Sequence, residues 1–212
     1  MMLQDPVGGG FVSSLARPGG NLTGFTNFDF TLVGKWLQLL KELSPGVVRA
    51  LALLNPDYPA RLKGYSTELA RIGPELGIEA QIAGVHDAAE IEAAITRFSE
   101  QPKGGLIALP DAVTGVYGPR IVELAATYRL PAVYAYAAPV RLGGLAAYTT
   151  SVEQDVERAA GYVDRILRGA VAGELPVQAS DRFLMLLNLK TAATLGLTIS
   201  PSLMAKVDEL VD

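Results

Sequence analysis

Residues that could recognise a small molecule recur along this sequence, each directly after a short apolar run. They combine amide and carboxylate oxygens, which accept hydrogen bonds from an amine, with tyrosine rings, which offer a flat apolar face and a polar tip. Such residue types suit noncovalent binding of a ligand with an apolar or aromatic body and an amine. The candidate ligand-binding residues are Asn55, Asp57, Tyr58, Asp111, the adjacent Ala112, Tyr134, Tyr136 and Tyr148.

Several of these residues also have a purely structural interpretation. Asn55 precedes a proline and could serve only to cap a turn, and Asp111 is placed to be the N-cap of the following helix. Tyr134 and Tyr136 point to the same side of a strand, so both could be core residues with their hydroxyls at the water. His86 follows another apolar run and is interpreted as a surface loop residue.

The composition argues against several kinds of chemistry. The chain of 212 residues has no cysteine and one histidine, which excludes thiol catalysis, thiolate metal sites and a histidine-rich metal site. His86 is not accompanied by a G-x-S-x-G nucleophile motif, and the three glycines at 8–10 lack the spacing of a dinucleotide-binding loop. The net charge of -4, without a basic face, argues against nucleic acid as a partner. We therefore expect neither an enzyme nor a cofactor.

The apolar runs alternate with amphipathic helical patterns, which is typical of parallel α/β sheets. Right-handed crossovers between the runs predict one five-stranded parallel sheet in the order 2-1-3-4-5, with helices on both faces and the first run central. Half of the residues are hydrophobic, as strands covered on both faces require. The predicted strands lie at 47–56, 78–85, 104–110, 130–136 and 144–150, and the predicted helices at 31–43, 59–76, 87–100 and 115–128.

The carboxyl ends of parallel strands meet at one edge of a sheet, and ligands of open α/β sheets bind there. The candidate residues listed above all follow predicted strands, so we expect this edge to carry the ligand site. Helix N-termini beside it would offer backbone N–H groups to a carboxylate.

The flanking segments do not complete a second sheet. Asp5 and Pro6 fit an N-cap followed by the first residue of a helix at 6–16, and residues 22–27 read as a strand. Ser151 begins a strong amphipathic helix at 151–169, and residues 182–189 read as another strand. The predicted organisation is a remnant of an N-terminal lobe with the first crossover at 1–30, a complete α/β lobe at 31–150, a helix and linker of the N-terminal lobe at 151–180, and a strand with helices at the lobe junction at 181–212.

Four stretches carry a resemblance to a known family. They are DPVGGGFVSSLARPGGNLTGFTNF, GKWLQLLKELSPGVVRALALLNPD, LPAVYAYAAPVRLGGLAAY and LPVQASDRFLMLLNLKTAATLGLTISPSLMAKVDELV. In this order they resemble the substrate-binding proteins of ABC transporters, in the group with tryptophan- and tyrosine-binding members. The resemblance runs over essentially the whole chain.

The resemblance implies a type I periplasmic-binding fold, in which two α/β lobes are joined by three crossovers and hold the ligand in the cleft between them. It implies capture of a small molecule, an aromatic or other amino acid, without chemistry, and an ABC permease as partner. Asp5 matches the family's cleft aspartate, and Asn27 lies near a crossover, so both join the candidate ligand-binding residues. Full-length members are periplasmic.

The first residues lack a basic segment followed by an apolar one, so we expect no signal peptide within this sequence. The resemblance implies that the signal peptide and most of the N-terminal lobe are missing from it. The apolar stripe of the 151–169 helix would then need a cover, which predicts a homo-oligomer formed through residues 1–30 and 151–180. Two alternatives stay open: the effector-sensing domain of a transcription regulator and, third, a two-lobed α/β enzyme.

Overall fold

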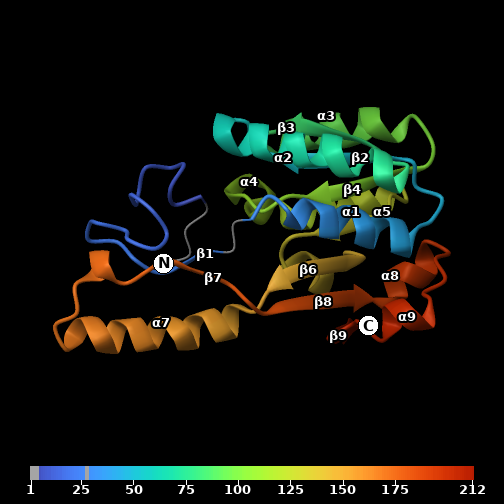
Figure 1. Ribbon diagram of the computed structural model, residues 1–212. Coiled ribbons are helices and arrows are strands. Elements are labelled where there is room, and N and C mark those ends of the chain that lie inside the picture. Colours follow the sequence, from blue (N-terminus) through green and yellow to red (C-terminus); the bar gives the residue numbers. More distant parts are fainter. Residues whose placement is uncertain (1–4, 27–28) are drawn as a thin grey trace. The chain divides into compact units, whose positions relative to one another are not determined.

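The computed structural model describes residues 5–26 and 29–212. The chain divides into two compact units, each built from two separate segments of the sequence. The first unit contains Met1–Asp29 and Thr150–Phe183, and the second contains Phe30–Thr149 and Leu184–Asp212. Figure 1 labels their helices and strands.

The second unit is built on a seven-stranded sheet in the order β3-β2-β4-β5-β6-β8-β9. The predicted order 2-1-3-4-5 for the first five strands is confirmed, and every described pairing among them is parallel. The sheet is wider than expected because β8 and β9 extend it. Its strands are β2 (Arg49–Leu54), β3 (Glu79–Gly84), β4 (Gly104–Ala108), β5 (Ala132–Tyr134), β6 (Ala146–Thr150), β8 (Phe183–Asn188) and β9 (Glu209–Val211).

The two added strands run against the first five. Asn188 at the end of β8 donates its backbone N–H to the carbonyl of Leu145, just before the start of β6, at 2.8 Å. Neighbouring strands whose opposite ends meet in this way are antiparallel. Strands β8 and β9 are parallel to each other. The run at 78–85 is not a fully buried strand, because β3 lies at the edge of the sheet and exposes part of its side chains.

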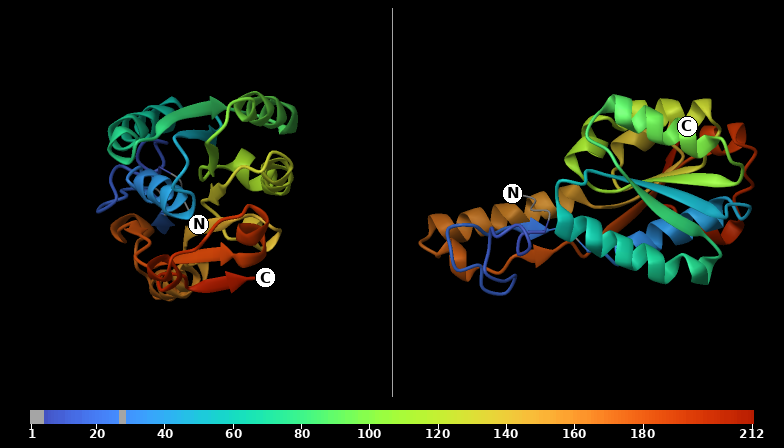
Figure 2. Two further views of the ribbon diagram at one scale, coloured as in Figure 1. Left: turned by 90° about the vertical axis from the view of Figure 1, so that its right-hand side faces the viewer. Right: turned by 90° about the horizontal axis from the view of Figure 1, so that it is seen from above.

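Helices cover both faces of the sheet, as the doubly wound pattern predicts (Figure 2). Helices α1 and α2 pack together on one face, and α3 and α5 pack together on the other. Amphipathic spacing explains the burial of α1, which turns Trp36 and Leu40 into the core. The helices and turns are α1 (Leu32–Leu43), α2 (Pro59–Ile72), η1 (Pro74–Leu76), α3 (Ala88–Ser99), α4 (Ala112–Val116), α5 (Gly118–Thr127), α6 (Ala138–Arg141), α8 (Leu189–Thr194) and α9 (Pro201–Met204).

Local sequence signals set where these helices begin and end. The Asp87 carboxylate accepts a hydrogen bond from the backbone N–H of Glu90 at 2.9 Å, which confirms the predicted cap of α3. Helix α2 ends at Ile72, before Gly73 and Pro74, as expected. The predicted helix at 115–128 is instead two helices, because the chain turns at Tyr117 and restarts with Gly118 and a proline.

The first unit is small. Its parallel strand pair, β1 (Phe25–Thr26) with β7 (Gln178–Ala179), packs with α7 (Val152–Leu167) and the turn η2 (Ala172–Glu174) around Phe25, Tyr162 and Leu175. The helix expected at 6–16 is wrong: Asp5–Phe11 forms turns, and Gly10 takes a left-handed φ of 71° that no continuing helix allows. Within the described part of the chain, every helix is too short or too polar to cross a membrane.

Candidate functional site

The carboxyl edge of the second unit's sheet brings several of the predicted residues together. The loops after β2, β3 and β4 lie side by side there, because these three strands are neighbours in the sheet and run parallel. Hydrogen bonds between side chains and backbone connect the loops in pairs. Four predicted or considered residues belong to this cluster, namely Asn55, Asp57, His86 and Asp111.

Asp111 connects the loops after β2 and β4. Its carboxylate is 1% exposed and accepts three backbone N–H groups. One comes from Asn55 at 2.6 Å, and the others come from Val113 at 2.6 Å and Thr114 at 3.1 Å. The last two make Asp111 the N-cap of α4. These bonds occupy the carboxylate, so its local role is to hold the two loops in register.

Asn55 holds its own loop in shape. Its side-chain oxygen accepts the backbone N–H of Asp57 at 2.9 Å, which is the pattern of an Asx-turn. The side chain of Asp57 then points to the next loop, where its Oδ1 lies 3.1 Å from Nε2 of His86. The capping interpretation of Asn55 therefore describes the structure, and Asp57 is left exposed at the edge.

His86 connects the loops after β2 and β3 through a pair of carboxylates. Its Nδ1 lies 2.8 Å from Oε2 of Glu90, while the opposite ring nitrogen faces Asp57. Glu90 also accepts the backbone N–H of His86 at 2.8 Å, so one carboxylate holds both groups. Hydrogen bonds with Glu90 and, second, with Asp57 raise the pKa of His86 above its ordinary value of 6.5. His86 is exposed, as expected of a surface loop residue.

Arg61, in the first turn of α2, is a member of this edge that the sequence reasoning missed. Its side chain is buried, and it donates from Nη2 to the carbonyl of Pro110 at 2.5 Å. Its Nε is buried without a hydrogen-bond partner, and no described carboxylate forms an ion pair with it. Its guanidinium carbon lies 5.4 Å from the centre of the Tyr58 ring. A buried cation without a counter-ion favours an anionic ligand.

The tyrosines are divided between different environments. Tyr58 is 55% exposed over Arg61, and Tyr136 is half-buried beside Gly115 of α4, near the exposed Ala112. These three predicted residues lie in or beside the loops of the same edge. Arg61 had one sequence signal that could have found it: an arginine one turn past a strand end, four residues after the carboxylate of Asp57.

Tyr148 and Tyr134 do not join the cluster. Tyr148 is on β6, three strands from β2 in the sheet, which is about 14 Å at the usual strand spacing. Burial, together with the Asp208 carboxylate, raises the pKa of the Tyr148 phenol. Tyr134 is 1% exposed within the core, so its burial argues against the predicted ligand contact at this edge. Its core interpretation describes the structure.

The two remaining candidates belong to the first unit. Asp5 has a left-handed φ of 48° and accepts the backbone N–H of Gly8 at 2.8 Å, so it caps a turn and not a helix. Asn27 lies outside the described residues. Among the described residues, no three His, Cys, Asp or Glu side chains are grouped closely enough to hold a metal ion. The cluster offers hydrogen-bond acceptors, one buried cation and two aromatic faces, which is equipment for binding.

Comparison with known proteins gives a match over almost the whole chain. The family model of the ABC transporter substrate binding protein matches residues 1–211. A tyrosine-binding protein of Clostridioides difficile (strain R20291) is 25% identical over 194 residues. That alignment covers 91% of this chain and 55% of the relative, so the chain spans about half the length of the curated relative it matches.

Solved structures show the same fold. The ABC domain in complex with L-Trp from Streptococcus pneumoniae superposes with a TM-score of 0.88 at 23% identity, covering 99% of this chain and 70% of that one. A LacI family transcriptional regulator from Bifidobacterium animalis matches less well, with a TM-score of 0.54 at 12% identity over 76% of this chain and 61% of the regulator. The fold is thus that of type I periplasmic-binding proteins.

Proposed function

The chain belongs to the family of ABC transporter substrate binding proteins, and on that premise we propose that it takes part in the capture of an aromatic amino acid for uptake. The observation that carries the proposal is the family match over residues 1–211. The relative that binds tyrosine and the similar structure solved with L-Trp support this ligand class. The proposed function is binding and release, with no covalent step. The regulator alternative has only fold-level support from a more distant match.

The carboxyl edge of the second unit provides the recognition that such a ligand needs. The buried guanidinium of Arg61 has donors left over after its bond to Pro110, and a carboxylate accepts two parallel N–H bonds from a guanidinium. The ring of Tyr58 lies over the same guanidinium and is open to solvent. We propose that the ligand's α-carboxylate binds Arg61 and that its ring stacks on Tyr58 or Tyr136.

Isothermal titration calorimetry with L-tyrosine, L-tryptophan and tyramine tests this proposal. Tyramine keeps the ring and the amine of tyrosine but lacks the carboxylate. We expect the protein to bind L-tyrosine or L-tryptophan and to bind tyramine at least tenfold more weakly. Replacing Arg61→Met should remove that preference, because the neutral side chain fills a similar space without the charge. Arg120→Met removes an exposed arginine paired with Glu92 and Glu123 and is the matched control.

A stacking tyrosine can be tested in the same titration. Tyr58→Ala should weaken binding about thirtyfold, since a well-packed aromatic anchor contributes about 2 kcal/mol. Failure of every aromatic amino acid to bind would refute the ligand class. A preference for tyrosine over tyramine that survives Arg61→Met would refute only the assigned anchor.

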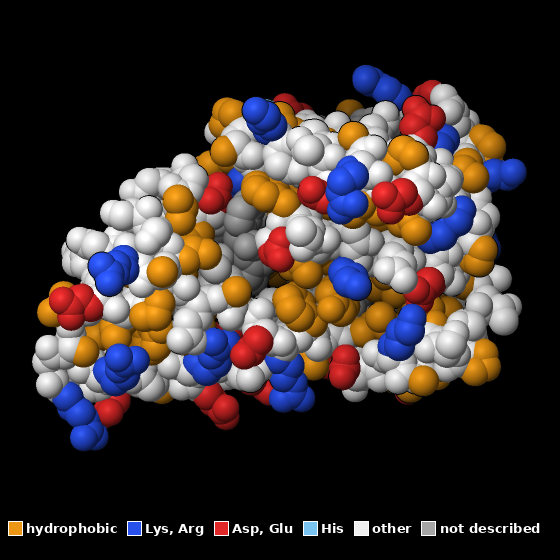
Figure 3. Space-filling view, viewed as in Figure 1, with side chains coloured by type: hydrophobic (Ala, Val, Ile, Leu, Met, Phe, Trp, Pro, Cys, Tyr) orange, Lys and Arg blue, Asp and Glu red, His pale blue; other side chains and the backbone are white. Residues whose placement is uncertain are grey.

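We propose further that the working location is outside the cytoplasm and that the partner is an ABC permease, as the family implies. The chain also carries a surface suited to a second copy of itself. Helix α7 exposes Val152, Val156 and Val163, each by more than half of its surface. Figure 3 shows apolar side chains at the surface of this unit between charged ones. An apolar stripe of this kind is more than a scatter of single residues and marks an interaction surface.

The proposed homo-oligomer forms through residues 1–30 and 151–180, about a two-fold axis. Size-exclusion chromatography with light scattering should give a mass above that of one 22.4 kDa chain. Replacing Val156→Asp and Val163→Asp together should lower the mass to that of a monomer. Val116→Asp, on the 71% exposed Val116 of α4, is the matched control and should leave the mass unchanged. A monomer mass for the unaltered protein at micromolar concentration contradicts the proposal.

A further inference from the structure

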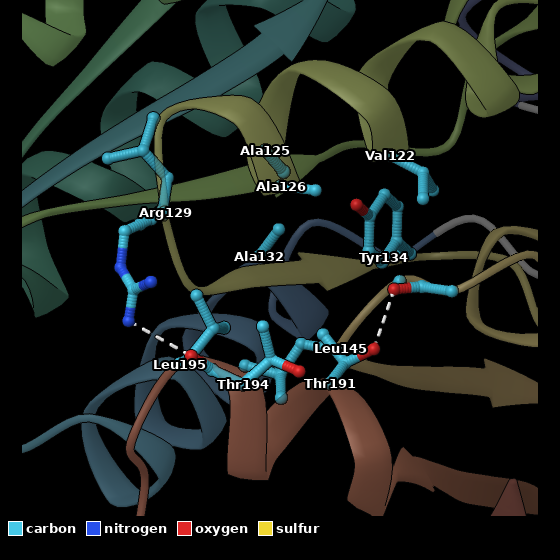
Figure 4. A pocket seen from close by; sticks show the side chains of 13 residues that line it. Val122, Ala125, Ala126, Arg129, Ala132, Tyr134, Leu145, Thr191, Thr194 and Leu195 are labelled. Carbon is cyan, nitrogen blue, oxygen red and sulfur yellow. Dashed lines mark hydrogen bonds between the residues drawn. The ribbon is translucent and has the colours of Figure 1, made fainter. Parts of the chain in front are cut away.

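A second pocket lies at the opposite end of the second unit's sheet from the carboxyl edge. It is formed where β5 and β6 begin and where α8 follows β8, and its volume is about 120 Å³. Figure 4 shows Val122, Ala125 and Ala126 of α5 on one side of this space and Leu145, Thr191 and Leu195 on the other, with Ala132 and Tyr134 between them. The pocket is distinct from the proposed amino-acid site, since none of its lining residues belongs to the Asn55–Asp111 cluster.

The pocket is largely apolar, with one unanswered polar atom. Tyr134 is buried among its walls, and its hydroxyl has no hydrogen-bond partner. The two threonine hydroxyls in the lining are already used, by Thr191 for the carbonyl of Gly143 and by Thr194 for the carbonyl of Lys190. A buried hydroxyl without a partner costs about 1–3 kcal/mol, and a bound group that pairs with it recovers much of that.

The size and the entrance limit what can bind. An apolar cavity of about 150 Å³ admits a benzene ring, so a pocket of 120 Å³ that is partly open has room for about one ring or a short branched chain. The guanidinium of Arg129 is at the rim, where Nη2 donates to the carbonyl of Thr194 at 2.9 Å, as Figure 4 shows. That bond ties the end of α5 to α8 and leaves the interior without a charged group.

We propose that this pocket is a second ligand site, which takes a small uncharged molecule of about one ring with a single hydrogen-bonding group that pairs with the Tyr134 hydroxyl. Apolar walls bind the body of such a molecule, and the buried hydroxyl selects for its polar atom. Phenol and benzene are suitable probes, because they share a ring and differ only in the hydroxyl.

Methyl NMR of the intact chain tests the proposal, with signals of Val122, Leu145 and Leu195 as reporters. Phenol should shift these signals saturably and bind more tightly than benzene. In Tyr134→Phe, the affinity for phenol should fall about fivefold to tenfold, while that for benzene stays the same or rises. Tyr128→Phe is the matched control, because its hydroxyl lies 2.8 Å from that of Thr96 and is absent from the lining.

A second variant checks the location without altering the buried hydroxyl. Ala126→Leu enlarges an exposed side chain of the lining on α5 and should abolish the shifts from both probes while the fold is kept. The proposal is overturned if neither probe shifts the reporters, which would mean that the pocket holds water only. It is equally overturned if Tyr134→Phe leaves the preference for phenol over benzene intact.

Discussion

Removing the Asp111 carboxylate should destabilise the second unit more than removing an ordinary helix cap. In Asp111→Ala, the backbone N–H groups of Val113 and Thr114 lose their cap, and a lost N-cap costs about 1 kcal/mol. The backbone N–H of Asn55 also loses its acceptor at a partly buried position, which costs about 1–3 kcal/mol more. We therefore expect the free energy of unfolding to fall by about 3 kcal/mol.

The chain contains its own probe for this measurement. Trp36 is the single tryptophan, and its buried indole N–H donates to the carbonyl of Tyr148 at 2.8 Å within the second unit. Its fluorescence during urea unfolding thus reports on the unit that contains Asp111. With a slope of about 2 kcal/mol per molar urea, the expected loss lowers the midpoint by about 1.5 M.

Asp87→Ala is the matched control, because it also removes the aspartate cap of a helix in the same unit. Its carboxylate is exposed and accepts one N–H, from Glu90. The loss should be about 1 kcal/mol or less. Equal destabilisation by the two variants would refute the reasoning, since the difference between them measures the bond from Asp111 to the neighbouring loop.

Three further predictions follow from other contacts. Hydrogen bonds with two carboxylates raise the pKa of His86, so the stability lost in His86→Ala should be greatest below about pH 6.5, the unfolded value, and should vanish as the pH rises through the folded pKa; paired urea titrations across this range check it, and a pH-independent difference contradicts it. Gly161→Ala meets open space in α7 and should stabilise by about 0.5–1 kcal/mol, whereas Gly64→Ala places a methyl group 2.3 Å from an aromatic ring and should destabilise, as opposite shifts in calorimetric melting would show. Ser180→Ala removes the 2.6 Å hydrogen bond to the buried Asp155 carboxylate and should cost about 1–3 kcal/mol, and an unchanged melting temperature would refute this.

The order of the parallel strands was predictable because local signals and general rules agree. Apolar runs of strand length, separated by amphipathic helices, allow few topologies once crossovers are right-handed. The cap at Asp87 and the end of α2 before Pro74 were predictable for the same reason, since each depends on residues within one turn. The helix at 6–16 failed because its apolar pattern was read without the backbone freedom of the glycines at 8–10.

The candidate site was predictable in place but only partly in membership. Strand ends directed attention to Asn55, Asp57 and Asp111, and these do lie at one edge. The sequence offered no means of telling that Tyr134 is enclosed by the core, or that Arg61 is buried without a carboxylate partner. Burial depends on which helices cover a strand, and that involves residues far apart in the chain.

The sequence by itself determined the α/β class, the parallel strand order and the family, because periodicity, caps and extended motifs are properties of neighbouring residues. Only the tertiary structure decided that β8 and β9 widen the sheet, that one carboxylate ties two loops together, and that Tyr134 lines a pocket remote from the carboxyl edge. The physical reason is that hydrogen-bond satisfaction and cavity shape are set by contacts between segments distant in sequence, and no local pattern encodes which atom is left without a partner.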